Sequence, residues 1–247
     1  MICRNNNLIH LSETESTNSY LQLLARLEDL ADETVVLTDF QTAGRGQSGN
    51  SWESENGKNL TFSILFYPKQ LPANQPFVIA ELAALFIKRI LDEIVSGITV
   101  KWPNDIYWQD RKICGILVEN MLAGGLIRKS IIGAGINLNQ EIFHGNAVNP
   151  VSLKQITGKT YNRLELLEKL RISFHKIRNQ LETQGIGFIH HTYTNSLYRL
   201  KGLHSFSDKN GNFKARIHHI ELSGHLVLKR ENGNLSKYAF KEVTCIN

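Results

Sequence analysis

The sequence has 247 residues, enough for one large domain or for one domain with a small appendage. Hydrophobic residues make up 42% and charged residues 21%, which excludes a disordered chain, a collagen and a coiled coil. No apolar run approaches the roughly 20 residues that cross a bilayer, and the N-terminus lacks the apolar core of a secretory signal. We therefore expect a cytoplasmic protein that does not contact a membrane.

The charge balance is 28 Lys and Arg against 23 Asp and Glu, a net charge of +5, which favours an anionic ligand. The charges are dispersed, and no helix-turn-helix, zinc-finger or RNA-binding pattern occurs, so we expect no nucleic-acid partner. The three cysteines, Cys3, Cys114 and Cys245, lie far apart and form no C-x-x-C pair. This spacing speaks against a zinc ribbon and a disulfide framework, and we expect no metal held by protein ligands alone.

The spacing of apolar residues predicts the secondary structure in chain order. A first helix follows Ser16, with Thr17 or Asn18 as its N-cap, because leucines then recur at helical spacing. The next predicted elements are strands at 34–40 and 60–68, a buried helix at 76–95, two strands within 98–108 around a proline turn, strands at 113–122 and 126–139, and a long amphipathic helix from about Asn162. Short polar turns join the strands, which favours a mixed, largely antiparallel sheet.

The character of the sequence changes after residue 195. Three glycine-containing turns separate short alternating runs there, which predicts a small β-barrel or meander of about 50 residues. We therefore expect an α+β fold of two domains, a sheet flanked by helices over 1–195 and a small β-barrel over 196–247. The adjacent His218 and His219 belong to one predicted strand, where alternation places them on opposite faces and disfavours a shared metal.

A polar stretch from Gln41 to Asn59 is unusually long for a loop, and such loops are mostly functional or disordered. It contains GRGQSG at 44–49, which matches the dinucleotide-binding pattern G-x-G-x-x-G. That pattern requires a helix at the third glycine and an acidic residue about 20 positions later, and this sequence has neither. Two interpretations stay open: a surface turn, or an adenylate-binding loop in which Arg45 faces an anion and Trp52 stacks on a base.

Three further stretches place polar groups beside predicted strands. KWPND at 101–105 is either a proline turn or a metal–phosphate site, since Asn and Asp oxygens suit Mg²⁺. Lys112 is either a solvated lysine at a strand edge or an ammonium aimed at an anionic substrate, with Gly115 allowing a ligand to approach closely. GAGIN at 133–137 is either a tight exit turn or a second place of close approach, with Asn137 contacting a nucleotide or Mg²⁺.

In this order, five of these stretches resemble the biotin protein ligases: STN at 16–18, QTAGRGQSGNSW at 41–52, KWPNDIY at 101–107, RKICGILVE at 111–119 and GAGIN at 133–137. Each motif is weak alone, but their combination is specific and covers nearly the whole chain. The resemblance implies a catalytic domain like those of class II aminoacyl-tRNA synthetases and a C-terminal SH3-like β-barrel. It also implies attachment of biotin to a lysine of a biotin carboxyl carrier protein, with ATP and Mg²⁺, through biotinyl-5'-AMP.

The resemblance further implies roles for individual residues. The residues that would bind biotin are Ser16, Thr17, Asn18, Gln41, Gly44, Arg45, Lys112 and Gly115. The residues that would bind ATP are Arg45, Gly46, Gln47, Trp52, Lys101, Asn104, Lys112 and Asn137. Lys112 and Arg45 would be the catalytic cations, and Asp105 would orient or deprotonate the incoming lysine. The loops 44–52 and 140–149 would shield the reactive adenylate from water.

Two features depart from the family pattern. Many members read G-R-G-R-x-G-R-x-W, whereas Gln47 and Asn50 here replace the second and third arginines, so the loop lacks two cations. Some members begin with a DNA-binding helix-turn-helix domain, and this sequence reaches Ser16 without room for one. We therefore expect no sequence-specific DNA binding.

Three alternatives to a biotin ligase stay open. The first is a lipoate-type acyl ligase on the same architecture, although the polar Ser16, Thr17, Asn18 and Gln41 favour a ureido ring over a dithiolane. The second is a biotin- or nucleotide-binding regulator without turnover, and the third is a basic RNA-binding protein. Both a monomer and a homodimer are compatible with the sequence.

Overall fold

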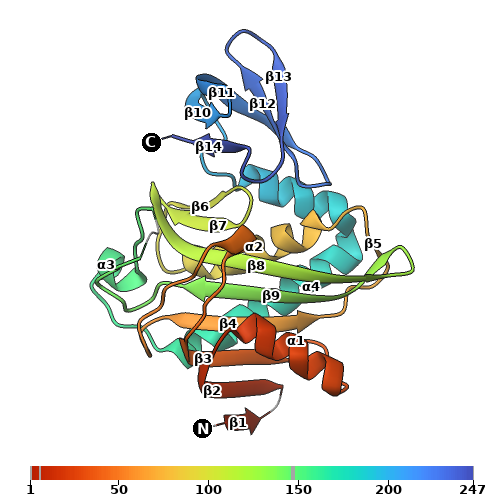
Figure 1. Ribbon diagram of the computed structural model, residues 1–247, viewed down its shortest axis with the longest axis vertical. Coiled ribbons are helices and arrows are strands. Elements are labelled where there is room, and N and C mark those ends of the chain that lie inside the picture. The colour runs from red at the N-terminus through yellow and green to blue at the C-terminus, as the bar shows by residue number, and fades with distance from the viewer. Residues whose placement is uncertain (1, 6, 146–147, 247) are drawn as a thin grey trace.

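The computed structural model (Figure 1) describes residues 2–5, 7–145 and 148–246. The strands of the main sheet are β1 (Ile2–Asn5), β2 (Leu8–Thr14), β3 (Val35–Gln41), β4 (Leu60–Phe66), β5 (Leu71–Pro72), β6 (Ile98–Lys101), β7 (Asp105–Trp108), β8 (Arg111–Ala123) and β9 (Leu126–Ile136). The helices are α1 (Thr17–Leu27), the 3-10 turn η1 (Gln47–Gly49), α2 (Phe77–Asp92), α3 (Leu153–Thr157) and α4 (Arg163–Asn195).

The strand order is β1-β2-β3-β4-β9-β8-β7-β6, with β5 paired to β9. Of the strand pairs in the described residues, β2–β3 is parallel and the others are antiparallel. The α+β fold with a mixed, largely antiparallel sheet is therefore confirmed. Short turns between β6, β7, β8 and β9 account for this pairing, because a tight turn returns the chain beside the strand that it leaves.

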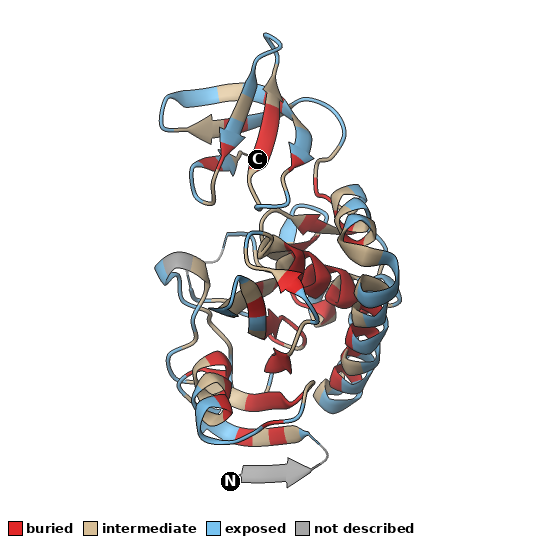
Figure 2. Ribbon diagram, turned by 90° about the vertical axis from the view of Figure 1, so that its right-hand side faces the viewer, coloured by how far each residue is buried: buried red, intermediate tan, exposed pale blue. Residues whose placement is uncertain are grey.

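The two faces of the sheet are covered by different helices, as alternation along β4 shows. Phe62 and Ile64 point into the main core with α2 and α4, whereas Leu65 packs in a smaller core with Leu21 and Ala25 of α1. In Figure 2 the buried residues lie between the sheet and α4, whose outer side is exposed. The α1 face thus has a helix over one end only, and its other end is free to form a site.

Two helix ends differ from the sequence-based prediction. Ser16, and not Thr17 or Asn18, is the N-cap of α1, since its backbone is extended and its Oγ accepts from the Ser19 N–H. Asn162 caps α4 as expected, but α4 is broken at Gly185, whose φ of 81° no helix permits. The predicted long amphipathic helix therefore consists of two helical segments.

The C-terminal segment forms a second, antiparallel sheet. Its strands are β10 (His204–Asp208), β11 (Gly211–Ile220), β12 (Leu226–Arg230), β13 (Leu235–Tyr238) and β14 (Val243–Cys245), in the order β13-β12-β11-β10-β14. The predicted meander is thus present. Among the described residues no hydrogen-bonded ladder joins β13 to β14, so closure of this sheet into a barrel is not seen.

The expectation that His218 and His219 lie on opposite faces of their strand is wrong. The register between β11 and β12 shifts between Ile217 and His219, so the alternation of side chains is interrupted at this β-bulge. The Nδ1 atoms of His218 and His219 lie 2.7 Å apart instead of on opposite faces. Among the described residues no group of three or more His, Cys, Asp or Glu side chains is arranged to hold a metal ion.

The second sheet rests on the main sheet near α2. The indole N–H of Trp102, in the β6–β7 turn, donates to the Gly224 carbonyl at 2.9 Å, and Gly224 lies against the ring of Phe77. The chain between the sheets runs along β6, where Val100 bridges to Leu197. The boundary between residues 195 and 196 therefore stays a prediction. None of the described helices is long and apolar enough to span a bilayer.

Candidate active site

A cavity of about 950 Å³ opens on the uncovered part of the α1 face, beside the second sheet. Every candidate residue named from the sequence lines it except Gly44. Gly44 lies just behind the wall, where a Cβ atom would be 2.4 Å from the Trp52 carbonyl oxygen. The structure thus brings together motifs that are up to 121 positions apart in the sequence, between Ser16 and Asn137.

Glycines of β8 and β9 form the floor of the cavity. Gly115 is paired with Gly135, and a Cβ atom on Gly135 would lie 2.2 Å from a ring carbon of Trp52. A Cβ atom on Gly133 would lie 2.2 Å from Asn18 Oδ1. Both positions require glycine because a side chain lies directly on the backbone. Trp52 therefore covers Gly115, the residue that the resemblance assigns to the biotin ring.

One end of the cavity is a buried set of hydroxyl and amide groups around the start of α1. Gln41 Oε1 accepts from the Thr17 N–H at 2.8 Å. Ser63 Oγ lies 2.7 Å from Thr17 Oγ1 and 2.6 Å from Asn18 Oδ1. Uncharged donors and acceptors of this kind suit a neutral polar ligand group, since no net charge has to be compensated.

The glycine-rich loop is attached to β8 through Arg45. Its NH2 nitrogen donates to both oxygens of Glu119, at 3.1 and 3.0 Å, and the same carboxylate accepts from Asn18 Nδ2 at 2.8 Å. Within the loop, the Gly46 N–H donates to the Asn50 carbonyl. The loop is therefore folded back on itself and held to the sheet by an ion pair.

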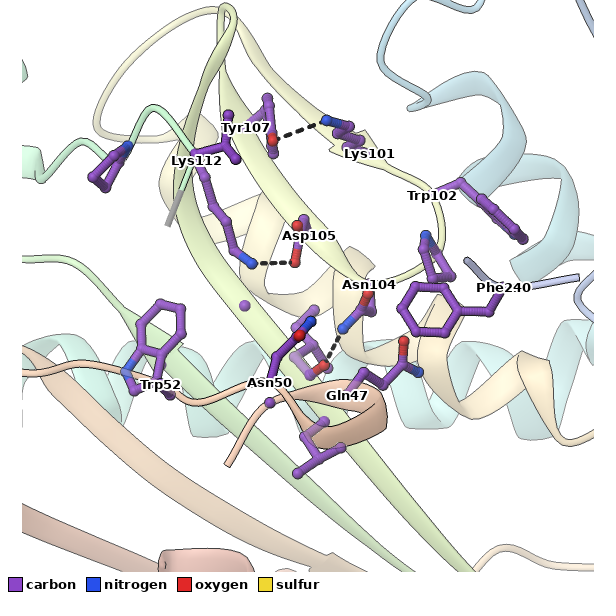
Figure 3. A pocket seen from close by; sticks show the side chains of 18 of the residues that line it. Gln47, Asn50, Trp52, Lys101, Trp102, Asn104, Asp105, Tyr107, Lys112 and Phe240 are labelled. Carbon is purple, nitrogen blue, oxygen red and sulfur yellow. Dashed lines mark hydrogen bonds and ion pairs between the residues drawn. The ribbon is translucent and has the colours of Figure 1, made fainter. Parts of the chain in front are cut away.

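Lys112 reaches into the middle of the cavity from the start of β8 (Figure 3). Its Nζ lies 2.7 Å from Asp105 Oδ1, and both side chains are about one-fifth exposed. The backbone of Lys112 is fixed on both sides, because its N–H donates to the Asn149 carbonyl and its carbonyl accepts from the Val151 N–H. Of the two interpretations from the sequence, the ammonium aimed into a site is the one that this geometry supports.

A second ammonium lies deeper, at the end of β6. Lys101 Nζ donates to Tyr107 Oη at 3.0 Å, and burial lowers the pKa of Lys101. Burial, reinforced by the nearby Asp105 carboxylate, raises the pKa of Tyr107 to about 12, so the phenol keeps its proton at neutral pH. This end of the cavity is therefore cationic.

Amide and carboxylate oxygens lie near these two lysines. Asn104 Nδ2 donates to the Ile116 carbonyl, and Asn137 Nδ2 donates to the Val151 carbonyl at 3.2 Å, so both amides are held in place. With Asp105 they form a set of oxygen-bearing side chains that fits Mg²⁺ when most of its ligands are phosphate oxygens and water.

Several lining or supporting residues escaped the sequence analysis. Ser63 is a polar residue within the largely apolar run LTFSILF, and Glu119 is the acidic end of the run KICGILVE, so the sequence marked both positions. The wall from the C-terminal segment carried none, because its residues lie more than 60 positions beyond Asn137, where the last motif ends. That wall includes Tyr198, Arg199, Phe206, Phe240, Cys245 and Ile246.

Comparison with known proteins identifies the family. The model of the biotin/lipoate A/B protein ligase family matches residues 11–137, about half of the chain. The chain belongs to this family. The chain is 32% identical over 206 residues to a curated relative, the bifunctional ligase/repressor BirA of Salmonella typhimurium. These residues cover 82% of this chain and 61% of the relative, so the chain spans about three-fifths of that protein.

Further comparisons extend this finding. The biotin–[acetyl-CoA-carboxylase] ligase of Paracoccus denitrificans is 30% identical over 196 residues, 77% of this chain and 80% of that protein. Among solved structures, the biotin protein ligase from Aquifex aeolicus in complex with biotin and ATP superposes with a TM-score of 0.77 at 26% identity. It covers 98% of this chain and is itself covered to 99%. The family fold therefore includes the second sheet as well as the main one.

Proposed function

We propose that this family member is a biotin–protein ligase. It would attach biotin to a specific lysine of a biotin carboxyl carrier protein, using ATP and passing through biotinyl-5'-AMP. The observation that supports this most is one cavity that joins a buried hydroxyl–amide end at Thr17 and Asn18 to a cationic end at Lys112 and Lys101. Relatives and similar structures named as biotin ligases point to the same substrate.

In the first step, a carboxylate oxygen of biotin attacks the α-phosphorus of ATP, and pyrophosphate leaves. Both reactants are anions, so the site must bring them together and stabilise the charge that develops on phosphorus. We assign this role to Lys112 and Arg45, whose present carboxylate partners can be exchanged for substrate anions. Mg²⁺, when bound, neutralises phosphate charge, and Asn104, Asp105 and Asn137 offer oxygens for it.

In the second step, the acceptor amine attacks the acyl carbon of the mixed anhydride. A C–N bond forms, the C–O bond to AMP breaks, and the amine loses a proton. Asp105 pairs with Lys112 in this structure, so a Lys112 that turns to the substrate leaves a carboxylate next to the reaction centre. That carboxylate can then orient the acceptor ammonium or take its proton.

Two loops would exclude water from the adenylate. The glycine-rich loop 44–52 lines the cavity, and so do Phe143, Gly145 and Val148 of the loop 140–149. Residues 146–147 of the second loop lie outside the described residues. Shielding matters because an acyl adenylate that meets water is hydrolysed before it reaches the carrier.

The remaining sequence-based expectations belong to the same proposal. The catalytic domain would be residues 1–195 and the C-terminal domain 196–247. The protein would act in the cytoplasm as a monomer or homodimer, without nucleic acid, and its macromolecular partner would be the carrier domain of a biotin-dependent carboxylase.

The deciding experiment is mass spectrometry of a purified biotin carboxyl carrier domain after incubation with this protein, MgATP and either biotin or lipoate. We expect a gain of one biotinyl group that requires ATP and is absent from a carrier in which the acceptor lysine is replaced by arginine. A gain with lipoate alone would transfer the proposal to the lipoate branch of the family. Biotin binding without any transfer would favour a regulator without turnover.

A further inference from the structure

We infer that Glu119 is a positioning residue that joins the polar end of the cavity to the glycine-rich loop. One carboxylate holds both the Asn18 amide and the Arg45 guanidinium. Arg45 is the cation of the segment 44–52, in which Gln47 and Asn50 are uncharged. The ion pair between Arg45 and Glu119 is therefore the electrostatic contact that holds the loop to the sheet. The kinetic part of this inference rests on the proposed function, whereas the structural part does not.

The strand geometry places Glu119 where both partners can reach it. Gly115, Leu117 and Glu119 alternate along β8 and therefore share the face that carries the cavity. Glu119 stands two residues beyond Leu117, whose carbonyl also accepts from Asn18 Nδ2 at 3.3 Å. The Glu119 side chain is about one-quarter exposed, so it is neither fully buried nor fully solvated.

Glu119 fixes the orientation of the Asn18 amide. An ionised carboxylate only accepts hydrogen bonds, so the NH₂ group of Asn18 must face Glu119 and the Leu117 carbonyl. The Asn18 Oδ1 then faces Ser63 Oγ at 2.6 Å. A rotated amide would place its oxygen against the carboxylate and its NH₂ group against Gly133. Glu119 thus determines which polar atom this end of the cavity presents.

Glu119 also determines where the loop rests. The Arg45 side chain is 43% exposed, so water competes for it, and a neutral residue at position 119 would hold it much less firmly. The loop amides of Gly46 and Trp52 donate to Asn50 and Gly44 within the loop. These hydrogen bonds stay protected from solvent exchange only while the loop is held on the sheet.

The first test measures hydrogen exchange of residues 44–52 in the ligand-free protein, wild type against Glu119→Gln. We expect exchange up to about fivefold faster in the variant, the size expected when a partly exposed ion pair is lost. Glu168→Gln is the matched control, because it removes the carboxylate of an ion pair with Arg171 on α4, far from the loop. Unchanged exchange in Glu119→Gln would overturn the inference.

A variant of the partner keeps the test valid if Glu119→Gln fails to fold. Arg45→Gln breaks the same pair from the exposed loop, so it should raise the exchange of 44–52 equally. Glu119→Asp keeps the charge and should restore most of the protection. Fast exchange in Arg45→Gln alone, with wild-type exchange in a folded Glu119→Gln, would contradict the pairing.

The second test is a double-mutant cycle on biotin-dependent pyrophosphate release. We expect Glu119→Gln to raise the KM for biotin about tenfold when Arg45 is present, but to add clearly less in the Arg45→Gln background, because Glu119 acts on the loop through Arg45. Additive effects would show that Glu119 acts on stability alone and would overturn the kinetic part. If no biotinyl-AMP forms with wild type, the proposed function fails, while the exchange test still decides the structural part.

Discussion

The two cations assigned to the reaction are each paired with a carboxylate in this structure. Lys112 pairs with Asp105 at 2.7 Å, and Arg45 pairs with Glu119 at 3.0 Å. All four side chains are partly exposed, and ion pairs of this kind contribute only about 0–1 kcal/mol to stability. Exchange of a carboxylate partner for a substrate anion therefore costs little, which suits a site that must release its cations to the ligand.

Replacement of Lys112 should separate activity from folding. We expect Lys112→Ala to reduce biotin-dependent pyrophosphate release about 100-fold or more, as when a charge-stabilising donor is removed from a transition state. The midpoint of thermal unfolding should stay close to that of wild type. The control is Lys154→Ala, which removes a partly exposed lysine paired with Glu141 outside the cavity. Release near the wild-type rate in Lys112→Ala would refute the catalytic role.

At this scale, the sequence predicts which residues gather but not how they pair. Lys112 and Asp105 both stand in recognisable motifs, yet their contact depends on the register between β7 and β8, which shifts between Ile106 and Tyr107. Ser63 and Glu119 were missed because a polar residue in an apolar strand has many explanations. Contacts between strands are set by the whole sheet and leave no mark in a single motif.

An ionisable pair lies in the core between the sheet and the two long helices. Phe174 of α4 makes edge-on contacts with Phe86 of α2 and Phe66 of β4, at centroid distances of 5.4 and 5.6 Å. Beyond this aromatic contact, Glu81 of α2 is 1% exposed and lies 2.6 Å from His190 Nδ1 on α4. The hydrogen bond to Glu81 raises the pKa of His190, and burial raises the pKa of Glu81.

Both shifts give stability the same dependence on pH. A group whose pKa is higher in the folded protein holds its proton there after the unfolded chain has lost it, so stability falls as pH rises through that range. We therefore expect wild type to lose stability relative to Glu81→Gln as pH rises from about 5 to above the ordinary histidine pKa near 6.5. Urea unfolding of both proteins across this range checks the sign, and a gap that widens in favour of wild type would refute it.

The elements themselves were largely predictable because their signals are local. Apolar spacing located α1, α2 and the strands around β8 and β9, and Gly124 and Gly125 adopt the positive φ angles that a tight β8–β9 turn requires. The break at Gly185 and the bulge at His218 were not predicted. A glycine within a helical pattern and an extra residue in a strand have their effect only through the partners that surround them.

For the whole molecule, the second sheet completes the cavity rather than forming a separate body. Phe240 and Cys245 line the cavity together with Trp102 of the β6–β7 turn. The contact between Gly224 and Phe77 anchors this sheet on α2, since a Cβ atom on Gly224 would lie 2.8 Å from the Phe77 ring. Displacement of the sheet would therefore open the cationic end of the site.

Two glycines of the second sheet allow a matched test. Gly224 and Gly233 have φ angles of 94° and 89°, but a Cβ atom on Gly233 would meet nothing within 4 Å. Alanine at either position introduces a similar backbone strain, which destabilises the folded protein by about 1 kcal/mol. We expect Gly224→Ala to lose about 1–3 kcal/mol more in urea unfolding and to raise the KM for ATP, whereas Gly233→Ala leaves that KM unchanged. Equal losses of stability and an equal KM for ATP in the two variants would show that the contact between Gly224 and Phe77 does not hold the second sheet in place.

The position of Trp52 affects how tightly this protein can hold any flat ligand. The indole covers Gly115 and Gly135, and among the described residues its buried N–H has no hydrogen-bond partner. A ligand that lies on the same floor must displace the ring, so its measured Kd equals the intrinsic Kd divided by the fraction of molecules whose floor is vacant. A vacancy of about one molecule in a hundred would weaken binding about a hundredfold. The measured affinity of this site thus reflects an equilibrium of the empty protein as well as its contacts with the ligand.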